Sequence, residues 1–476
     1  MGRKEGGINS IVLEGRLTPD HKTRSDYRLL PFEVPTGTCR IEVRYTYNRD
    51  ADNVLDLGLF DPRGTDFLCA KGFRGWSGGA RDHVVITERS ATPGYLPGPI
   101  FPGIWHVLLG LYQISSSGCS YRIEILLSQK EGDPPQPPPP AKELNLMTRP
   151  GPAWFKGDLH AHTHHSDAHC SVAELAAAAR CQGLDFLAVT DHNTVSHHAY
   201  LTAHSGPELL LIPGQEVTTY RGHANVWGRG SWLDFRCRSR EEMARIIGEA
   251  HRQGLLFSIN HPKPKGPEWL FGSELPFDCV EVWQGLWCWN NEHSLAFWER
   301  LLRQGRRVVA VGGSDTHPFP LSDGRLLHWL GCPTTWVYAK ALTLDAVLAG
   351  IRAGHVTITA WPTAARAVLS IRGRDAAALQ GDVVDMEECT VEVHVVGGEG
   401  FWLRLLTRYG EIAREHISSP DWKYEQKLNL AVHGYVRAEV RMPGQDATPL
   451  ERLPMVTMTN PVWHAAFLNS RIKEGI

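Results

Sequence analysis

The sequence predicts an α/β fold at the centre of the chain, a parallel sheet or barrel with a β-sandwich-like domain on either side. Three observations support this. Short apolar runs alternate with helix-like segments in the middle of the chain, whereas strand-like segments without helices fill both ends, and a proline-rich stretch follows the first end. Alternating strands and helices are typical of parallel α/β folds, and strands split by turn residues are typical of β-sandwiches. We therefore divide the chain into a β-sandwich domain (1–132), a proline-rich linker (133–152), an α/β domain (153–365) and a second β domain (366–476).

Length and composition limit what the chain can be. Its 476 residues are 42% hydrophobic, which is enough for two or three cores. The 49 Lys and Arg nearly balance the 52 Asp and Glu, so we expect a small-molecule substrate and no extended nucleic acid. No apolar run suggests a signal peptide or a membrane span. Ten cysteines without a C-x-x-C pair predict unpaired thiols and a cytoplasmic protein, and the oligomeric state stays open.

The β-rich ends and the linker are identified by local patterns. The first end contains the strand-like segments CRIEVRYTY, VLDLGLF, HVVITE, IWHVLLGLYQI and YRIEILL, and the second contains AVLSIRG, CTVEVHVV, WLRLLTRYG and YVRAEVRMP. Turn-forming Gly, Pro, Asn and Asp separate them. In DPPQPPPPA, residues 133–141, successive prolines remove backbone donors and favour an extended spacer.

Four central helices are predicted from their ends. Ser171 with Glu174, and SREE beginning at Ser239, are capping boxes, and these two helices stop near Gly183 and Gly254. Two further helices are expected at about residues 291–304 and 344–353. Strand-like FLAVT, LLFSIN and RVVAVGG lie between these helices.

Histidines and carboxylates follow five apolar runs of the central domain. In GDLHAHTHHSD, His160 and His162 are two residues apart on an expected strand and so project from one face. The other runs end with Asp191 and His192, with Glu216, with His261, and with Asp315 and His317. A pair of histidines by itself would suggest only surface residues. Because active sites of parallel barrels collect at the carboxyl ends of strands, five such ends predict a metal site.

These motifs resemble a known family. H-x-H with Asp five residues later, then D-H, Glu, N-H-P and S-D-x-H, are similar to the PHP family, named for polymerase and histidinol phosphatase, over about residues 153–365. Within this range RGHANVWG, VEVWQGLW, NNEHSLAFWERLLRQGRR and AVGGSDTHP, and later MTNPVWH, resemble the CehA/McbA branch, named for carbaryl-hydrolysing enzymes. The resemblance implies a distorted (β/α)7 barrel with up to three divalent metal ions.

The resemblance also implies a ligand set. One ion would be held by His160, His162, Glu216 and Asp315; Glu216 would bridge to a second held by His223 and His261; a third would take Asp167, His192 and His317. Glu216, His192 and Asp315 would act in catalysis through a metal-bridging hydroxide. Imidazole and carboxylate ligands without thiolate suit Zn²⁺, Mn²⁺ or Fe²⁺, so we expect two or three such ions.

Other polar and aromatic residues have open roles. Asp191 either accepts a hydrogen bond that orients its neighbouring ligand or caps a turn. Trp283, Trp287 and Trp289 line a substrate pocket or pack in the core, and Lys263 faces an anionic leaving group or is solvated. Eight further histidines are expected to be solvated or to have loop roles: His164, His165, His169, His197, His198, His204, His251 and His293.

Three functions fit the sequence. The first is phosphoester hydrolysis, as a phosphatase or phosphodiesterase, because most relatives in the PHP family act on phosphate. The second is carbamate, ester or amide hydrolysis, which the CehA/McbA resemblance suggests. The third is a non-catalytic metal-binding or carbohydrate-binding protein, which the complete ligand set disfavours.

Overall fold

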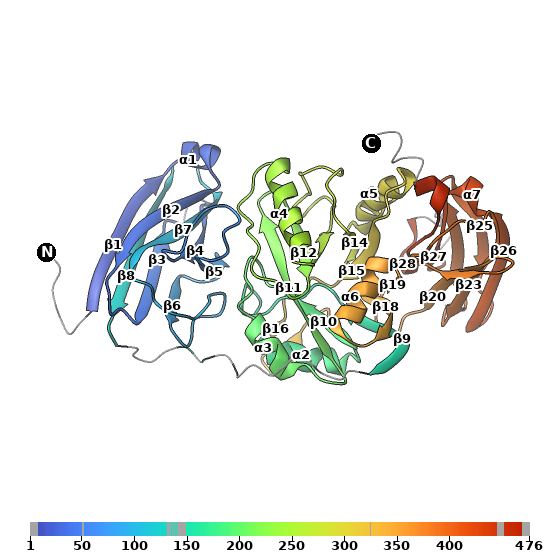
Figure 1. Cartoon of the computed structure of the whole chain (residues 1–476), viewed down its shortest axis with the longest axis horizontal. Helices are drawn as coiled ribbons and strands as arrows, with labels where there is room; N and C mark the ends of the chain where they lie inside the picture. The colour runs from blue at the N-terminus through green and yellow to red at the C-terminus, as the bar shows by residue number, and fades with distance from the viewer. Residues whose placement is uncertain are drawn as a thin grey trace.

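The computed structural model describes residues 8–49, 52–130, 149–323, 325–444 and 452–468, with three single prolines between 131 and 148. Figure 1 shows three parts in a row: an N-terminal β region in blue, a central region in green and yellow, and a C-terminal β region in orange and red. Most of the proline-rich linker lies outside the described residues. Its last three residues, 150–152, already belong to strand β9. No helix within the described ranges is long and apolar enough to span a membrane.

The N-terminal β region consists of two four-stranded antiparallel sheets. One sheet has the order β1 (Ile8–Leu17), β8 (Cys119–Ser128), β3 (Arg40–Tyr47), β6 (His83–Thr87), and the other β2 (Tyr27–Val34), β7 (Gly103–Gln113), β4 (Val54–Phe60), β5 (Phe73–Gly78). A short helix, α1 (Pro19–Arg24), joins β1 to β2. Ile123 and Ile125 of one sheet and Leu57 and Leu59 of the other are fully buried in one cluster. The sheets therefore pack face to face, as strands with one apolar face must.

The central region is built on a row of seven strands. In order along the sheet these are β9 (Pro150–Asp158), β10 (Phe186–Val189), β11 (Leu210–Thr219), β12 (Gly222–Trp227), β13 (Leu256–Ile259), β14 (Cys279–Gln284) and β15 (Val309–Gly313). The segments that follow β9 and β15 meet, because His162 N donates to Thr316 O at 3.0 Å and Asp315 N to His160 O at 2.9 Å. The row of strands therefore curves, so that the segments after its first and last strands, which carry predicted ligands, lie side by side.

The expected (β/α)7 barrel is not shown. Strand β12 is antiparallel to both neighbours and follows β11 after two residues, Tyr220 and Arg221, which leave no room for a helix. No helix separates β13 from β14 either. The other connections contain α2 (Val172–Cys181), α3 (His198–His204), α4 (Arg240–Arg252) and α5 (Asn291–Arg303). The fold is a mixed α/β structure with many strands and few helices.

The predicted helix ends are confirmed. Ser171 and Ser239 each accept a hydrogen bond from the backbone N–H three residues on, and the glutamates there complete both capping boxes. The chain leaves helices α2 and α4 at Gly183 and Gly254, which adopt positive φ of 65° and 75°. Helix α6 (Leu344–Ala353) ends in the same way, at Gly354.

The C-terminal β region shares a sheet with the central region, which the sequence did not predict. From β9 the sheet continues through β18 (Thr334–Ala341), β19 (Val356–Thr359), β28 (Met455–Thr459), β27 (Tyr435–Arg441), β24 (Trp402–Thr407) and β25 (Gly410–His416). A second sheet, β21 (Ala377–Leu379), β20 (Arg366–Arg372), β23 (Glu388–Val396) and β26 (Asp421–Asn429), packs against it. Short elements complete the fold: β16 (Phe319–Pro320), β17 (Leu326–Leu327), β22 (Val383–Val384), α7 (Leu430–His433) and β29 (Val462–His464).

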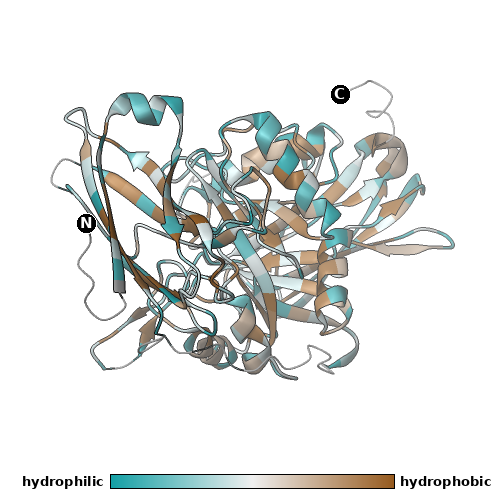
Figure 2. Cartoon of the chain, turned by 60° about the vertical axis from the view of Figure 1, so that its left-hand side comes forward, coloured by the Kyte–Doolittle hydropathy of each residue, from teal (hydrophilic) through white to brown (hydrophobic). Residues whose placement is uncertain are grey.

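The N-terminal β region packs directly on the central region. Phe73 of β5 stacks on Trp232 of the central region, with ring centroids 3.8 Å apart and planes 7° apart. Trp76 packs against Phe235 at 4.6 Å. In Figure 2 the hydrophobic residues lie mainly on the strands of both regions, and hydrophilic residues mark loops and outer helix faces. One apolar cluster therefore joins the two regions, which fixes the first region beside the ligand-bearing strand ends.

Candidate metal centre

Eight of the nine predicted ligands fall into three tight groups of side chains in the central region. His160 and His162 were expected on a strand, but β9 ends at Asp158 and they follow it. Their rings still lie 5.1 Å apart, because the backbone beyond the strand stays paired to the segment after β15. The ninth residue, His261, is in none of the groups.

The first group contains His160, His162, Glu216 and Asp315. Asp315 Oδ1 is 3.2 Å from His160 Nε2 and 3.0 Å from His162 Nε2. Glu216 Oε2 is 3.4 Å and 3.5 Å from the same two atoms. Both histidines and the glutamate are fully buried. These four residues are the set that the family resemblance implied for one ion.

The second group contains His192, Glu216 and His223. Glu216 Oε2 lies 2.8 Å from His192 Nδ1, and Oε1 lies 3.1 Å from His223 Nδ1. His261 Nε2 is 3.8 Å from the same Oε1, so this ring is adjacent but farther away. His192 thus joins Glu216 and His223 in this group, and His261, which the resemblance implied here, borders it, with its ring centroid 5.6 Å from that of His223.

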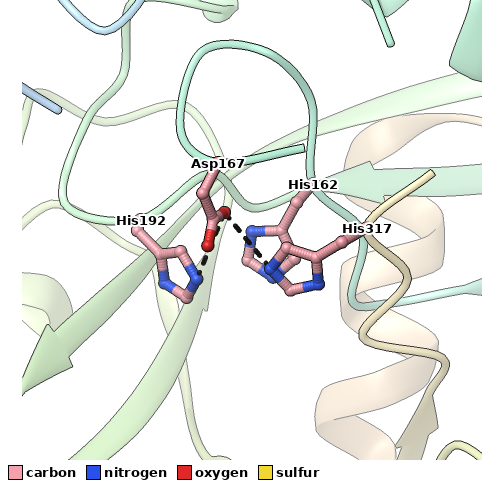
Figure 3. Close-up of side chains that lie close together, drawn as sticks. All are labelled: His162, Asp167, His192 and His317. Carbon is pink, nitrogen blue, oxygen red and sulfur yellow. Dashed lines mark ion pairs between the residues drawn. The ribbon is translucent and has the colours of Figure 1, made fainter. Parts of the chain in front are cut away.

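The third group surrounds Asp167, which lies between His192 and His317 in Figure 3, with His162 behind. Asp167 Oδ1 is 3.2 Å from His317 Nε2 and 3.7 Å from His192 Nε2. The Asp167 side chain is 47% exposed, whereas that of Glu216 is 1% exposed. The third group is thus the most open to solvent, and His162 joins it to the first group.

The charges of the cluster are mutually stabilised. Burial raises the pKa of Glu216, but the imidazoles of His160, His192 and His223 outweigh it and hold that pKa well below its ordinary value. Burial lowers the pKa of His192, and the carboxylates of Glu216 and Asp167 outweigh it and raise the pKa to about 10. Burial and two neighbouring imidazoles lower the pKa of His162 to about 4. The cluster thus contains ionised carboxylates and a neutral His162, the forms that bind metals, whereas His192 carries a proton that a bound ion would displace.

Unpaired buried atoms fit the binding of metal ions. Within the described part of the chain, His160 Nε2 and Glu216 Oε2 are buried and make no hydrogen bond of suitable geometry, although they lie 3.4 Å apart and each has a further oppositely charged neighbour, Asp315 Oδ1 at 3.2 Å and His192 Nδ1 at 2.8 Å. Buried polar atoms normally have partners, because leaving one unpaired costs about 1 to 3 kcal/mol. An ion between the imidazole and the carboxylate satisfies both. The donor set therefore fits divalent ions such as Zn²⁺, Mn²⁺ or Fe²⁺.

Three residues that the sequence analysis did not identify contact predicted ligands and fix their orientation. Glu281 Oε1, on β14, is 2.9 Å from His160 Nδ1; Asn260 donates to Glu216 Oε1 at 2.8 Å; and Gln284 donates to Asp315 Oδ2 at 2.9 Å. Glu281 had a signal in the sequence, because a carboxylate inside the apolar run CVEVW is rarely buried without a partner. No comparable signal in the sequence marks Asn260 or Gln284.

Asp191 orients a loop rather than its neighbour His192. It accepts hydrogen bonds from the backbone and hydroxyl groups of Thr163 and Ser166, at 2.7 to 3.0 Å. Its other contact is His197 Nδ1, at 3.1 Å. Asp191 therefore shapes the turn between His162 and Asp167, which carries two ligands.

The structure corrects the expectation for two histidines and shows where the lysine and the tryptophans with open roles lie. His165 and His197 are fully buried instead of solvated, and Lys263 is also buried, with Nζ 2.9 Å from Asn291 Oδ1. Burial lowers the pKa of this lysine to about 8. Trp283 and Trp287 pack on each other in the core, 4.7 Å between centroids, whereas Trp289 is 40% exposed.

Two of the predicted ligands have an unfavourable backbone conformation. His261 and Asp315 adopt positive φ of 29° and 51°, a region that non-glycine residues seldom occupy. Such conformations cost of order 1 to 3 kcal/mol and persist where the surroundings over-determine them. The strain marks this part of the chain as shaped for a site.

A cavity of about 700 Å³ opens beside the cluster. Asp167, His192 and His223 line one side of it. The opposite side comes from the N-terminal β region and includes Trp76 and Tyr112. A small molecule of drug-like size fits such a volume and would contact the second and third ligand groups.

The sequence matches one family over part of its length: residues 158–275 fit the family model of the PHP domain. The chain contains a PHP domain. The matched range includes every predicted ligand except Asp315 and His317, which follow β15. No curated protein matches the sequence.

Three solved structures are similar at 16% identity each. A two-domain protein from Bacteroides vulgatus, described as containing a predicted PHP-like metal-dependent phosphoesterase, has a TM-score of 0.37, and the match covers 68% of this chain and 99% of that one. A candidate metal-dependent phosphoesterase from Bifidobacterium adolescentis has a TM-score of 0.26, with 41% and 94% covered. An amidohydrolase from Chromobacterium violaceum, with bound sulfate and no metal, has a TM-score of 0.24, with 36% and 90% covered.

Proposed function

We propose that the protein is a metal-dependent phosphoesterase, a phosphatase or phosphodiesterase, that acts on a small substrate. One observation carries the proposal: the three ligand groups share His162, His192 and Glu216, and two of them border the cavity. Shared ligands would hold the ions next to one another. Adjacent divalent ions are the usual device for clamping the oxygens of a phosphoryl group.

The residues divide between the ions as the groups suggest. His160, His162, Glu216 and Asp315 would hold the first ion; His192, Glu216 and His223, with His261 beside them, the second; Asp167, His192 and His317, next to His162, the third. When bound, such ions lower the pKa of water towards neutrality and neutralise the negative charge of the phosphoryl group. The metal's identity among Zn, Mn and Fe stays a prediction, as does the cytoplasmic location.

The chain's own contribution is to fix ligand orientation. Glu281 Oε1, 2.9 Å from His160 Nδ1, would accept a hydrogen bond from that nitrogen and so leave Nε2 of the ring to bind an ion. Asn260 and Gln284 hold one oxygen each of Glu216 and Asp315. In this proposal Glu216, His192 and Asp315 serve catalysis through the ions that they hold.

The test is a substrate panel. Purified protein reconstituted with Mn²⁺ or Zn²⁺ is assayed against an aryl phosphate monoester, a phosphodiester and an aryl carbamate. Glu216→Gln, purified in the same way, controls for contaminating hydrolases. We expect phosphate release that Glu216→Gln abolishes; hydrolysis of none of the three substrates by the wild type would contradict the proposal.

Carbamate or ester hydrolysis, the CehA/McbA type of reaction, is a second candidate. The observation that favours it is the aromatic wall of the cavity, because an aryl carbamate carries an uncharged ring and no phosphate. Both reactions would use the same ions and differ in the group attacked. In the panel, cleavage of the carbamate with phosphate esters left intact would favour this candidate.

A further inference from the structure

The cavity beside the metal centre has two chemically different sides. Asp167, His192 and His223 form the ligand side. Facing them are Trp76 on β5 and Tyr112 on β7, both from the N-terminal β region, with Tyr220 from the turn between β11 and β12. Apart from Tyr220, these residues are far from the ligand side in sequence and belong to a part of the chain outside the matched PHP domain.

The aromatic side is held firmly against the central region. Tyr220 donates from its hydroxyl to Asp56 Oδ2 at 2.6 Å and stacks on Tyr27 at 5.6 Å. The Tyr112 ring meets Tyr220 edge-on, with centroids 5.2 Å apart. Arg81 donates to the carbonyl of Ser166 at 2.9 Å, next to the ligand Asp167. The N-terminal β region is therefore fixed both to the aromatic side and to the ligand loop.

The composition of the cavity selects a kind of ligand. Among its described lining residues there is no lysine or arginine, and the side chains away from the ligands are aromatic or small, apart from Asp56, which accepts a hydrogen bond from Tyr220. An anionic group would find no counter-ion on that side. An aromatic or apolar group would cover aromatic surface and gain from stacking or edge contacts.

We propose that Trp76, Gly79, Tyr112 and Tyr220 form a subsite for the aromatic or apolar leaving group of the ester cleaved at the metal centre. This inference rests on the proposed phosphoesterase function and adds the substrate class. The phosphoryl group lies at the ligand side and the leaving group lies against the N-terminal β region. The N-terminal β region is thus part of the active site.

Gly79 offers a direct way to fill this subsite. It lines the cavity, and a Cβ placed on it would meet only Asp56 Oδ1 at 3.8 Å and Leu55 O at 4.0 Å, both ordinary contacts. Its neighbour Gly78 has a φ of 54° and would be strained by any side chain. A Cβ at position 79 therefore fits without displacing a neighbour, and we expect the longer side chain of Gly79→Leu to narrow the cavity. Gly206→Leu is the matched control, because a Cβ there meets nothing within 4 Å and Gly206 does not line the cavity.

The experiment compares the binding of two non-hydrolysable ligands by calorimetry to metal-loaded protein: phenylphosphonate and methylphosphonate. Burying a phenyl ring against the aromatic side should make the wild type prefer phenylphosphonate by about ten-fold. Tyr112→Ala and Gly79→Leu should each reduce this preference to about two-fold or less, with methylphosphonate affinity unchanged. Gly206→Leu should behave as the wild type. Equal preference in all four proteins, or no preference in the wild type, would overturn the subsite.

Hydrolysis separates this inference from the function on which it rests. Phenyl phosphate and methyl phosphate are the matching substrates, and the two cavity variants should each lower the ratio of kcat/KM for phenyl phosphate to kcat/KM for methyl phosphate, whereas Gly206→Leu should keep the wild-type ratio. If the wild type prefers phenylphosphonate and the variants lose this preference, but no ester is cleaved, the subsite stands and the phosphoesterase proposal fails. If esters are cleaved with the same phenyl preference in every variant, the subsite fails and the function stands.

Discussion

Replacing Glu281 tests whether a buried carboxylate sets the metal affinity of the centre. Glu281 Oε1 lies 2.9 Å from His160 Nδ1, and both side chains are almost completely buried. Glu281→Leu removes the acceptor, so the His160 ring loses the partner that fixes its proton on Nδ1. Glu281→Gln keeps an acceptor of the same size but removes its charge.

The expected magnitude follows from this single hydrogen bond. Loss of such a partner of a metal-binding histidine costs about 10- to 100-fold in metal affinity. That range corresponds to roughly 1.4 to 2.7 kcal/mol. Because charge-assisted hydrogen bonds are about twice as strong as neutral ones, Glu281→Gln should lie between Glu281→Leu and the wild type.

The assay is competition between the protein and a coloured chelator for Zn²⁺ or Mn²⁺. Glu241→Gln, at an exposed position on α4, is the control for a lost surface charge. Thermal unfolding of the metal-free proteins shows whether each variant still folds. Wild-type affinity in a folded Glu281→Leu variant would refute the role of Glu281 in positioning His160.

Three further predictions concern other parts of the chain. Arg81→Ala, which frees the loop beside Asp167, should lower the metal content by up to about one equivalent on elemental analysis; unchanged content would contradict the role of Arg81 in holding this loop. Burial raises the pKa of Asp56 to about 6, so the folded state binds more protons than the unfolded state between about pH 4 and 6 and loses stability as the pH rises. In urea unfolding of metal-free protein, the free energy of unfolding of Asp56→Asn relative to that of the wild type should therefore increase by about 1 kcal/mol or more from pH 4 to 7. A difference that does not change with pH would contradict the raised pKa of Asp56. Glu439 is buried among arginines, including Arg437 at 2.7 Å. Glu439→Gln should therefore lower the free energy of unfolding by about 3 kcal/mol in urea unfolding. A decrease of less than about 1 kcal/mol would contradict a stabilising role for these ion pairs.

The parts of the fold that follow local rules could be predicted from the sequence. Capping residues such as Ser171 and Ser239 act within one helical turn, so their hydrogen bonds can be inferred from spacing alone. Most of the predicted ligands could be identified because polar residues after apolar runs are expected to meet at one end of a sheet, and the structure brings eight of the nine together. The antiparallel strand β12 was missed because its direction is set by a two-residue turn that carries no strong hairpin signal.

What the sequence could not supply depends on long-range packing. His192 Nδ1 lies 2.8 Å from Glu216 Oε2 and His261 Nε2 lies 3.8 Å from Oε1, and no spacing in the sequence indicates which of these rings is nearer. The contact of Trp76 and Tyr112 with the cavity arises where two regions far apart in the chain come together. No local pattern of residues encodes such a contact.

The central claim is that Glu216 is a ligand shared by two ions of a metal centre that hydrolyses phosphate esters. The most direct test measures metal content and turnover on the same preparations. Glu216 contacts His192 and His223 through different oxygens, whereas Asp167 is half-exposed and belongs only to the third group. We expect at least two metal equivalents in the wild type, turnover abolished in Glu216→Gln, and measurable turnover with about one equivalent less in Asp167→Asn. Less than one equivalent in reconstituted wild type, or wild-type turnover and unchanged metal content in Glu216→Gln, would contradict the account.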